Sequence, residues 1–263
     1  MAIIREDGAI VVRKKENGKT KLKHFENMDE LIRKMNCYDE ECGRFEFEPT
    51  NCDLSGLDFS NAEFTAHENE YTGEIDRIRF DGSDLSNCSF HNSDRIYRCT
   101  FADVKIDGAD FSNTYWEGSS LNGIKGKNVN FENCSFNEIH LNEAEFTDSS
   151  FKNTAFWKVQ MNRSKFIDCN LEISDGGGHC GLRDADISGS SINENFSDFA
   201  FLPNLKTDHI KGTPKAIQSL HKLQEEHNKE YIGEKAEKEK MMKDPQAQAL
   251  IAQFRAMGIE IDL

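Results

Sequence analysis

The stretch from Cys99 to Leu171 repeats every five residues without a slip. The residue two places before each large position is small or β-branched, as at Cys99, Val104 and Ala109. Except for Gly126, the large positions hold large apolar residues: Phe101, Ile106, Phe111, Trp116, Leu121, Phe131, Phe136, Leu141, Phe146, Phe151, Phe156, Met161, Phe166 and Leu171. A fixed period of this kind decides the fold class before any other feature of a sequence.

A period of five fits neither an α-helix nor a continuous strand. Within one repeat, however, the small and the large residue are two positions apart, so both point to the same side of an extended segment. The other three positions hold mostly Asp, Asn, Glu, Ser, Gly and Lys, which face water or turn the chain. Short strands joined by bends wind into a solenoid, and its coils must stack because no single repeat buries its apolar side alone.

Segments such as 109–113 (Ala-Asp-Phe-Ser-Asn) and 144–148 (Ala-Glu-Phe-Thr-Asp) resemble the pentapeptide-repeat family. The pattern of that family is a small residue, Asp or Asn, Leu or Phe, and two polar residues. The resemblance covers about Cys52 to Leu205. It implies a mainly β fold, a right-handed four-sided β-helix with four repeats in each coil.

A coil of four repeats places residues twenty apart on top of one another. We therefore expect two core ladders with rings offset face to face at ~4.8 Å per coil. One ladder consists of Phe111, Phe131, Phe151 and Leu171, and the other of Trp116, Phe136 and Phe156.

The chain divides into three parts by pattern: residues 1–48, 49–211 and 212–263. The first part predicts a small α+β cap, with hairpin turns at Asp7-Gly8 and Asn17-Gly18 and a helix from Met28 to Met35 that Asn27 caps. The second part is the β-helix. A cap is expected because an open solenoid end exposes unpaired strand groups.

The third part predicts C-terminal α-helices. Thr213-Pro214 is a helix start, and residues 225–243 form an exposed helix or linker rich in Lys and Glu. Asp244-Pro245 starts a second helix with Leu250 and Phe254 on its apolar face. The first helix is expected to cap the β-helix, and the second to dock back, form a homodimer or lie in a groove of a partner.

The five-residue period breaks at three places. The intervals from Phe64 to Ile75, from Phe90 to Phe101 and from Leu171 to Leu182 are eleven residues rather than ten, so each is expected to hold one inserted residue that bulges from a corner. Trp157 follows a large position, so it points outward and either contacts a partner or packs under a terminal segment. The candidate partner contacts are Glu68, Glu70, Tyr71, Arg95, Tyr97, Trp157, Leu250 and Phe254.

Charge is concentrated in the repeat region. The chain has a net charge of −15, and residues 51–211 hold 14 basic and 27 acidic residues, a net charge of −13. Such a rod repels nucleic acid and attracts a basic groove on a partner. The alternative interpretation is that Asp serves turns and solubility. No apolar run approaches the ~20 residues of a membrane span, and the N-terminus is not a signal peptide.

The sequence predicts no catalytic residue, no cofactor and no metal site. Cys52, Cys88, Cys99, Cys134, Cys169 and Cys180 occupy the small inward position, where a free cysteine behaves as a small apolar residue. No pair has zinc-ligand spacing, and no nucleotide-binding or hydrolase motif is present. Many reduced thiols suit a reducing cytosol, so a cytoplasmic location is expected, with secretion left open.

We therefore expect a non-enzymatic scaffold for protein–protein interaction. The resemblance offers one alternative, a DNA mimic that binds DNA gyrase or topoisomerase and protects or inhibits it. A second alternative is a secreted bacterial effector that binds a host protein. Acidic residues in paired stripes along the rod would favour the mimic, and an even scatter would argue against it.

Overall fold

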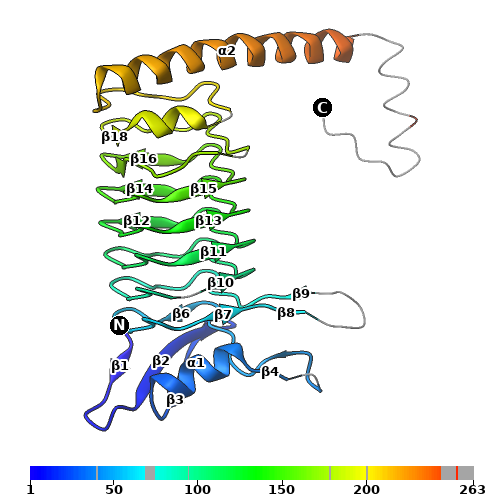
Figure 1. Ribbon diagram of the computed structural model, residues 1–263. Helices are drawn as coiled ribbons and strands as arrows, with labels where there is room; N and C mark the ends of the chain where they lie inside the picture. Colours follow the sequence, from blue (N-terminus) through cyan, green and yellow to red (C-terminus); the bar gives the residue numbers. More distant parts are fainter. Residues whose placement is uncertain are drawn as a thin grey trace.

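The computed structural model of the chain is a four-sided β-solenoid that describes residues 1–39, 41–68, 75–93, 95–177, 179–199 and 201–243, together with Gln253. Figure 1 shows the coils stacked into a rod, with a small α+β module at the N-terminal end and a long helix across the other end. The mainly β, four-sided architecture predicted from the repeat is confirmed.

Each side of a coil is a short strand or a single bridge that pairs in parallel with the same side of the next coil. Regular partners are twenty residues apart, as in the pairing of Trp116 with Phe136. One side is a five-stranded sheet of β7 (Phe64–Thr65), β10 (Ile96–Tyr97), β11 (Tyr115–Glu117), β13 (Ser135–Asn137) and β15 (Ala155–Trp157).

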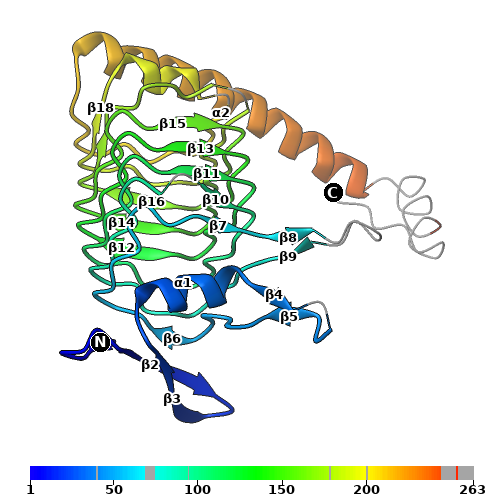
Figure 2. The same ribbon diagram turned by 60° about the horizontal axis from the view of Figure 1, so that its bottom comes forward.

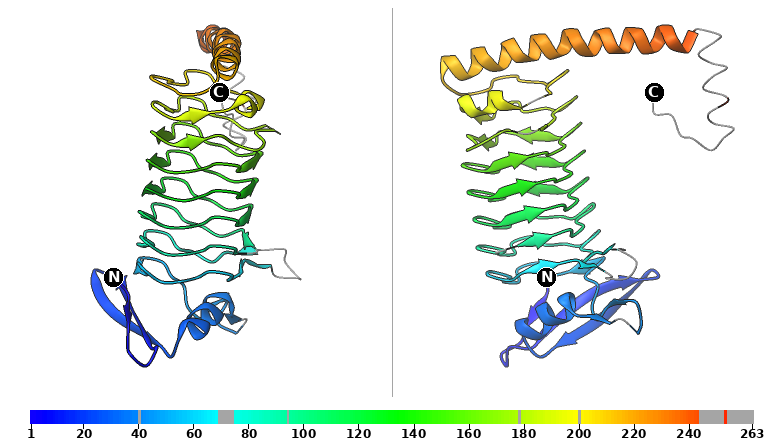
Figure 3. Two further views of the ribbon diagram at one scale, coloured as in Figure 1. Left: turned by 60° about the vertical axis from the view of Figure 1, so that its left-hand side comes forward. Right: turned by 45° about the vertical axis from the view of Figure 1, so that its right-hand side comes forward.

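The other three sides are less regular. One contains β12 (Lys125–Lys127), β14 (Glu145–Thr147) and β16 (Lys165–Ile167), and another contains β17 (Asn170–Leu171) and β18 (Ser191–Ile192). The fourth consists of isolated bridges, such as the one between His140 and Gln160. Two views in Figure 3 show that the coils remain parallel along the whole rod.

A stack of phenylalanine rings fills the axis. Phe111, Phe131 and Phe151 stack with centroids 5.1 and 5.0 Å apart and interplanar angles of 8° and 19°. The same stack continues toward the N-terminus through Phe90 and Phe59, with centroid separations of 4.8 and 4.9 Å. All five rings are fully buried, so each contributes on the order of 2 kcal/mol or more of apolar burial.

The second ladder has a different geometry from the expected one. Trp116 and Phe136 are tilted by 57° at 5.9 Å, and Phe136 and Phe156 by 46° at 5.4 Å. The offset face-to-face arrangement does not hold there, because the Trp116 ring also packs at 5.2 and 5.4 Å against Phe101 and Phe111. Tilted contacts are as favourable for aromatic rings as offset stacks.

Left-handed backbone turns the chain at the corners. Asn51, Gly82, Asp103 and Gly123 occupy one corner in successive coils, and each has a positive φ between 55° and 69°. A Cβ added at Gly123 would lie 2.7 Å from Asp103 Oδ1. Glycine at position 123 thus leaves room for the Asp103 side chain over the turn, and Asn or Asp adopts the same left-handed conformation at many other corners.

The N-terminal module covers the first coil. It consists of β1 (Ile3–Ile4), β2 (Ile10–Glu16), β3 (Lys19–Phe25), α1 (Met28–Asn36) and the hairpin of β4 (Tyr38–Asp39) and β5 (Arg44–Phe45). The predicted hairpins and the Asn27 cap of α1 are present. β2 pairs with β6 (Cys52–Asp53), and the Asn36 side chain bonds to Glu63 O and Thr65 N, so backbone groups of the first coil are satisfied.

A short 3-10 helix, η1 (Glu194–Asp198), and α2 (Pro214–Lys243) cover the other end. Ala216 and Leu220 are buried, and Leu202 N donates to His227 Nδ1 at 3.2 Å. The predicted exposed segment 225–243 is part of one continuous helix, and the second helix expected from Asp244 lies outside the described residues. Within the described part of the chain, no helix has the length and apolar character to cross a membrane.

The first insertion is a hairpin rather than a one-residue bulge. β8 (His67–Glu68) and β9 (Ile75–Asp76) pair antiparallel, and Asp53 pairs with Asp84, a step of 31 residues instead of 20. The expectation that Ile75 resumes the repeat is wrong, because Ile75 pairs with Glu68 inside this hairpin. The other two insertions add one residue each, as predicted, because Ser89 pairs with Asp110 and Gln160 with Gly181.

Close packing around the axis leads to a first prediction. A Cβ added at Gly126 would lie 2.4 Å from Val129 Cγ2 and 2.7 Å from Ile106 Cγ1. We expect Gly126→Ala to lower the free energy of unfolding by ~1–3 kcal/mol, the usual effect of overpacking a core. Chemical denaturation followed by circular dichroism measures the change.

Gly233→Ala in α2 is the matched control, since an added Cβ there meets nothing within 4 Å. Alanine is favoured over glycine in a helix by ~1 kcal/mol, so this variant should be at least as stable as the parent chain. Equal destabilisation by both substitutions would contradict the packing around Gly126.

Candidate interaction surface

The outward side of the five-stranded sheet carries three of the predicted contacts, Arg95, Tyr97 and Trp157. The parallel register places four outward residues in one column: Tyr97, Glu117, Asn137 and Trp157. The large residue directly before each of them in the sequence is buried. Tyr115 lies beside this column, one position before the buried Trp116. We call the surface of Arg95, Tyr97, Tyr115, Glu117, Asn137 and Trp157 the outer sheet face (Figure 2).

The N-terminal half of the outer sheet face is an ordered network. The Arg95 guanidinium lies 4.1 Å from the Tyr97 ring centroid, and that of Arg98 lies 4.9 Å from it. Arg95 Nη2 is 2.9 Å from Glu117 Oε2, which also accepts a hydrogen bond from the Tyr115 hydroxyl at 3.4 Å. These side chains therefore hold each other in fixed positions before any partner arrives.

Trp157 lies in the other half of the outer sheet face. Its side chain is 50% exposed. Its ring atom Cζ3 lies 3.7 Å from the position that a Cβ added to Gly177 would occupy. Gly177 thus leaves room for the ring, and half of the Trp157 side chain faces solvent. The outward direction predicted for Trp157 is observed, and its contact with a partner stays a prediction.

Two projections extend on the same side of the rod as the outer sheet face (Figure 1). One is the β8–β9 hairpin, and the stacking of His67 on Tyr38 at 4.0 Å and 9° joins it to the β4–β5 hairpin. The other is the C-terminal part of α2. Phe201 contacts Tyr231, whereas Ile232 is 65% exposed and the helix continues to Lys243 away from the coils.

The predicted contacts divide into three groups. Arg95 and Tyr97 touch each other, and Trp157 lies further along the same face. Glu68 is in β8, whereas Glu70, Tyr71, Leu250 and Phe254 lie outside the described residues. Sequence reasoning missed Tyr115 and Glu117, although their positions on either side of Trp116 mark them as outward-facing.

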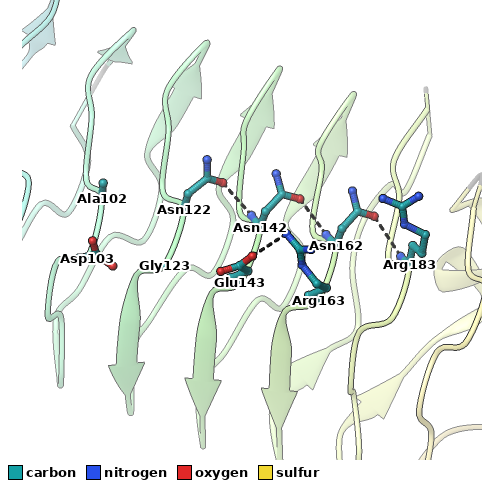
Figure 4. A pocket seen from close by; sticks show the side chains of 9 residues that line it. All are labelled: Ala102, Asp103, Asn122, Gly123, Asn142, Glu143, Asn162, Arg163 and Arg183. Atoms are coloured by element: carbon teal, nitrogen blue, oxygen red, sulfur yellow. Dashed lines mark hydrogen bonds and ion pairs between the residues drawn. The ribbon is translucent and has the colours of Figure 1, made fainter. Parts of the chain in front are cut away.

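A second surface is an open groove of about 510 Å³ along one corner (Figure 4). The side-chain oxygens of Asn122 and Asn142 accept hydrogen bonds from backbone N–H groups one coil further on, at 2.9 and 3.0 Å. Arg163 and Glu143 pair at 2.5 Å across the groove. The asparagine ladder thus satisfies the backbone at the corner and has a structural role.

Acidic and basic side chains are mixed along one side of the rod. Acidic side chains are paired with basic ones one coil away, as in Lys165 with Glu145 at 3.4 Å and Lys158 with Glu138 at 2.8 Å. One outward column runs Asp53, Asp84, Lys105, Lys125, Glu145, Lys165, Asp186 and Lys206. In this column the acidic residues therefore do not form an unbroken stripe.

The buried cysteines are unreactive at neutral pH. Burial raises the pKa of the Cys52, Cys88, Cys134 and Cys169 thiols to about 12 and that of Cys180 to about 11. A thiol in this state is neither a nucleophile nor a metal ligand at neutral pH. Within the described residues, no group of three or more His, Cys, Asp and Glu side chains could hold a metal ion.

These pKa values give a second prediction. A buried thiol stays protonated in the folded protein, whereas the unfolded chain ionises near its ordinary pKa of 9.0. The resulting stability is present below pH 9 and is lost as pH rises toward 12, at up to ~1.4 kcal/mol per pH unit for each thiol. We expect the urea midpoint of unfolding to fall above pH 9.

Alkylation at pH 8 with mass spectrometry tests the same burial directly. In the folded protein we expect modification of the exposed Cys42 and the half-buried Cys37, and modification of all eight cysteines after unfolding. Rapid alkylation of Cys134 in the folded protein would contradict the buried arrangement.

Residues 107–175 match the family model described as the SV2A/B/C luminal domain. No curated protein matches the chain. Among solved structures, the chain is similar to QnrB1, a plasmid-mediated fluoroquinolone resistance protein, with 16% identity over 64% of this chain and 84% of that one and a TM-score of 0.39.

Two further structures are similar to the chain. A pentapeptide repeat protein from the Arabidopsis thaliana thylakoid lumen has 24% identity over 41% of this chain and 66% of that one, with a TM-score of 0.30. A pentapeptide repeat protein from the cyanobacterium Cyanothece 51142 has 11% identity over 62% and 88%, with a TM-score of 0.28. By its own five-residue repeat and four-sided coil, the chain has the fold of the pentapeptide-repeat proteins.

Proposed function

We propose that the protein is a non-enzymatic scaffold that binds a protein partner on the outer sheet face. The observation that carries this proposal is the half-exposed Trp157, which shares one sheet with the exposed Tyr115 two coils away. Tryptophan, tyrosine and arginine are the residues that contribute most binding energy in protein interfaces. All three types are present on the outer sheet face.

Rigidity supports the same role. The three inner strands of the sheet each pair with a strand on both sides, and a hydrogen-bonded network links Arg95, Glu117 and Tyr115. A partner therefore meets a surface that loses little conformational entropy on binding. The β8–β9 hairpin and the C-terminal part of α2 extend beyond this surface and add contact area at its two ends.

The chemistry of the surface defines the partner. Arg95, Arg98 and Lys158 offset Glu117 and Glu138 on this side of the rod. The contact we propose is therefore aromatic and hydrogen-bonded, and a basic groove on the partner would be attracted to the acidic rod as a whole rather than to this face. Eight unpaired cysteines support a reducing, cytoplasmic setting.

The third prediction tests this surface. The purified protein is immobilised on a solid support and incubated with an extract of the cells that produce it. The proteins that it retains are quantified for the parent chain and for Trp157→Ser. We expect at least about tenfold less retention of the specific partner, since truncation of such an anchor costs ~2 kcal/mol or more.

Gln160→Ser is the matched control, because Gln160 is also exposed but belongs to the side of the rod that consists of isolated bridges. This variant should retain the same proteins as the parent chain. If Trp157→Ser and Gln160→Ser retain identical sets, the outer sheet face is not the binding surface.

The fourth prediction concerns the DNA-mimic alternative. The net charge of −13 on residues 51–211 supports this alternative, whereas the alternation of Lys with Asp and Glu along the column described above weighs against it. We expect the purified protein neither to inhibit gyrase supercoiling at micromolar concentration nor to protect gyrase from a quinolone. Clear inhibition or protection would favour the mimic over the general scaffold.

A further inference from the structure

The chain contains two Asn-Gly pairs, Asn17-Gly18 and Asn122-Gly123. In such a pair the backbone nitrogen of the glycine can attack the side-chain carbonyl carbon of the asparagine, because glycine has no side chain that hinders the approach. This reaction is one reason why asparagine is a thermolabile residue. The two pairs lie in different surroundings, and the surroundings decide which of them reacts.

Asn17-Gly18 is the exposed two-residue loop between β2 and β3. Asn17 has a φ of 51° and Gly18 a φ of 74°, as a tight type I′ turn requires. Within the described residues, neither the Gly18 N–H nor the side-chain amide of Asn17 makes a hydrogen bond. A Cβ added to Gly18 would meet nothing within 4 Å. Neither the attacking nitrogen nor the carbon that it attacks is therefore held away from the other.

Asn122-Gly123 is fixed at a corner of the rod (Figure 4). Gly123 N donates a hydrogen bond to Asn142 O at 2.9 Å, and Asn122 Oδ1 accepts one from Asn142 N at 2.9 Å. Attack by the Gly123 nitrogen would require both bonds to break, which means local separation of two coils. Asn122 is exposed like Asn17, so hydrogen bonding rather than exposure distinguishes the two pairs.

We propose that Asn17 is a site of spontaneous modification, at which the asparagine is converted to aspartate and isoaspartate. The Gly18 nitrogen loses its proton to solvent and forms a bond to Asn17 Cγ. The bond from Cγ to Nδ2 breaks, and the amide nitrogen takes up a proton and leaves as ammonia. Water then adds to one of the two carbonyl carbons of the five-membered imide and opens the ring.

The two products have different effects on the hairpin. Aspartate keeps the length of the main chain and tolerates a positive φ. Isoaspartate adds one main-chain carbon to a two-residue loop that the Glu16–Lys19 pair closes. The type I′ geometry is then lost, so the strand pairing next to the loop opens. The same strand β2 pairs with β6 through Arg13 and Lys14, so the change lies beside the contact between the N-terminal module and the first coil.

Incubation of the folded full-length protein at pH 8, followed by peptide mass spectrometry, tests the site. We expect the mass increase of an amide-to-acid conversion in the peptide that contains Asn17. Conversion at Asn122 should be at least about tenfold slower, because the coils must open before that pair reacts. In guanidinium chloride, where both pairs are unfolded, the two rates should become equal.

Asn17→Gln is the matched control, since the same attack would have to form a larger ring, and its peptide should keep its mass. Equal rates at Asn17 and Asn122 in the folded protein would overturn the proposal. So would an Asn17 peptide that reacts only after unfolding.

Hydrogen–deuterium exchange of residues 14–21 tests the effect on the hairpin. The fraction that contains isoaspartate, identified by its fragment ions, should exchange at least about tenfold faster there than the parent chain. The Asn17→Asp variant has the same added charge but a normal main chain, so it should exchange at the rate of the parent chain. Equal exchange in the isoaspartate fraction and in the parent chain would overturn the opening of the hairpin.

Discussion

The backbone hydrogen bonds between successive coils are the interaction on which the rest of the structure depends. These bonds join parallel segments of neighbouring coils, and they keep paired residues twenty positions apart in the sequence wherever the chain is regular. This step brings Phe111 directly under Phe131 and Phe131 under Phe151. The aromatic stack, the left-handed corners and the outward columns all follow from one register, so a side chain's place on the rod follows from its number.

The fold could be predicted because one pattern specifies it many times over. Fifteen repeats between Cys99 and Leu171 agree in phase, and no competing structure satisfies all of them. The helix from Met28 to Asn36 was predictable for a different reason, since Asn27 supplies a local cap that the structure uses. Both signals are independent of distant contacts, which is why sequence reasoning could find them.

The places where prediction failed are those where tertiary contacts decide. Ile75 has the spacing of a core residue, yet pairing with Glu68 draws it into a hairpin. The ring of Trp116 is tilted because it contacts Phe101 and Phe111 within the core, which no spacing reveals. On the surface, Arg95 was predictable as exposed, but its pairing with Glu117 depends on a one-residue insertion that aligns β10 with β11.

The stepwise construction of the rod has a consequence for the two projections beside the outer sheet face. The β8–β9 hairpin and the C-terminal part of α2 are separated by whole coils, so their spacing can change only in increments of ~4.8 Å. Loss or gain of twenty residues between Trp116 and Phe156 would shorten or lengthen that span by one increment and leave both projections on the same side. Evolution can thus change the distance between the two projections one coil at a time, without changing either projection.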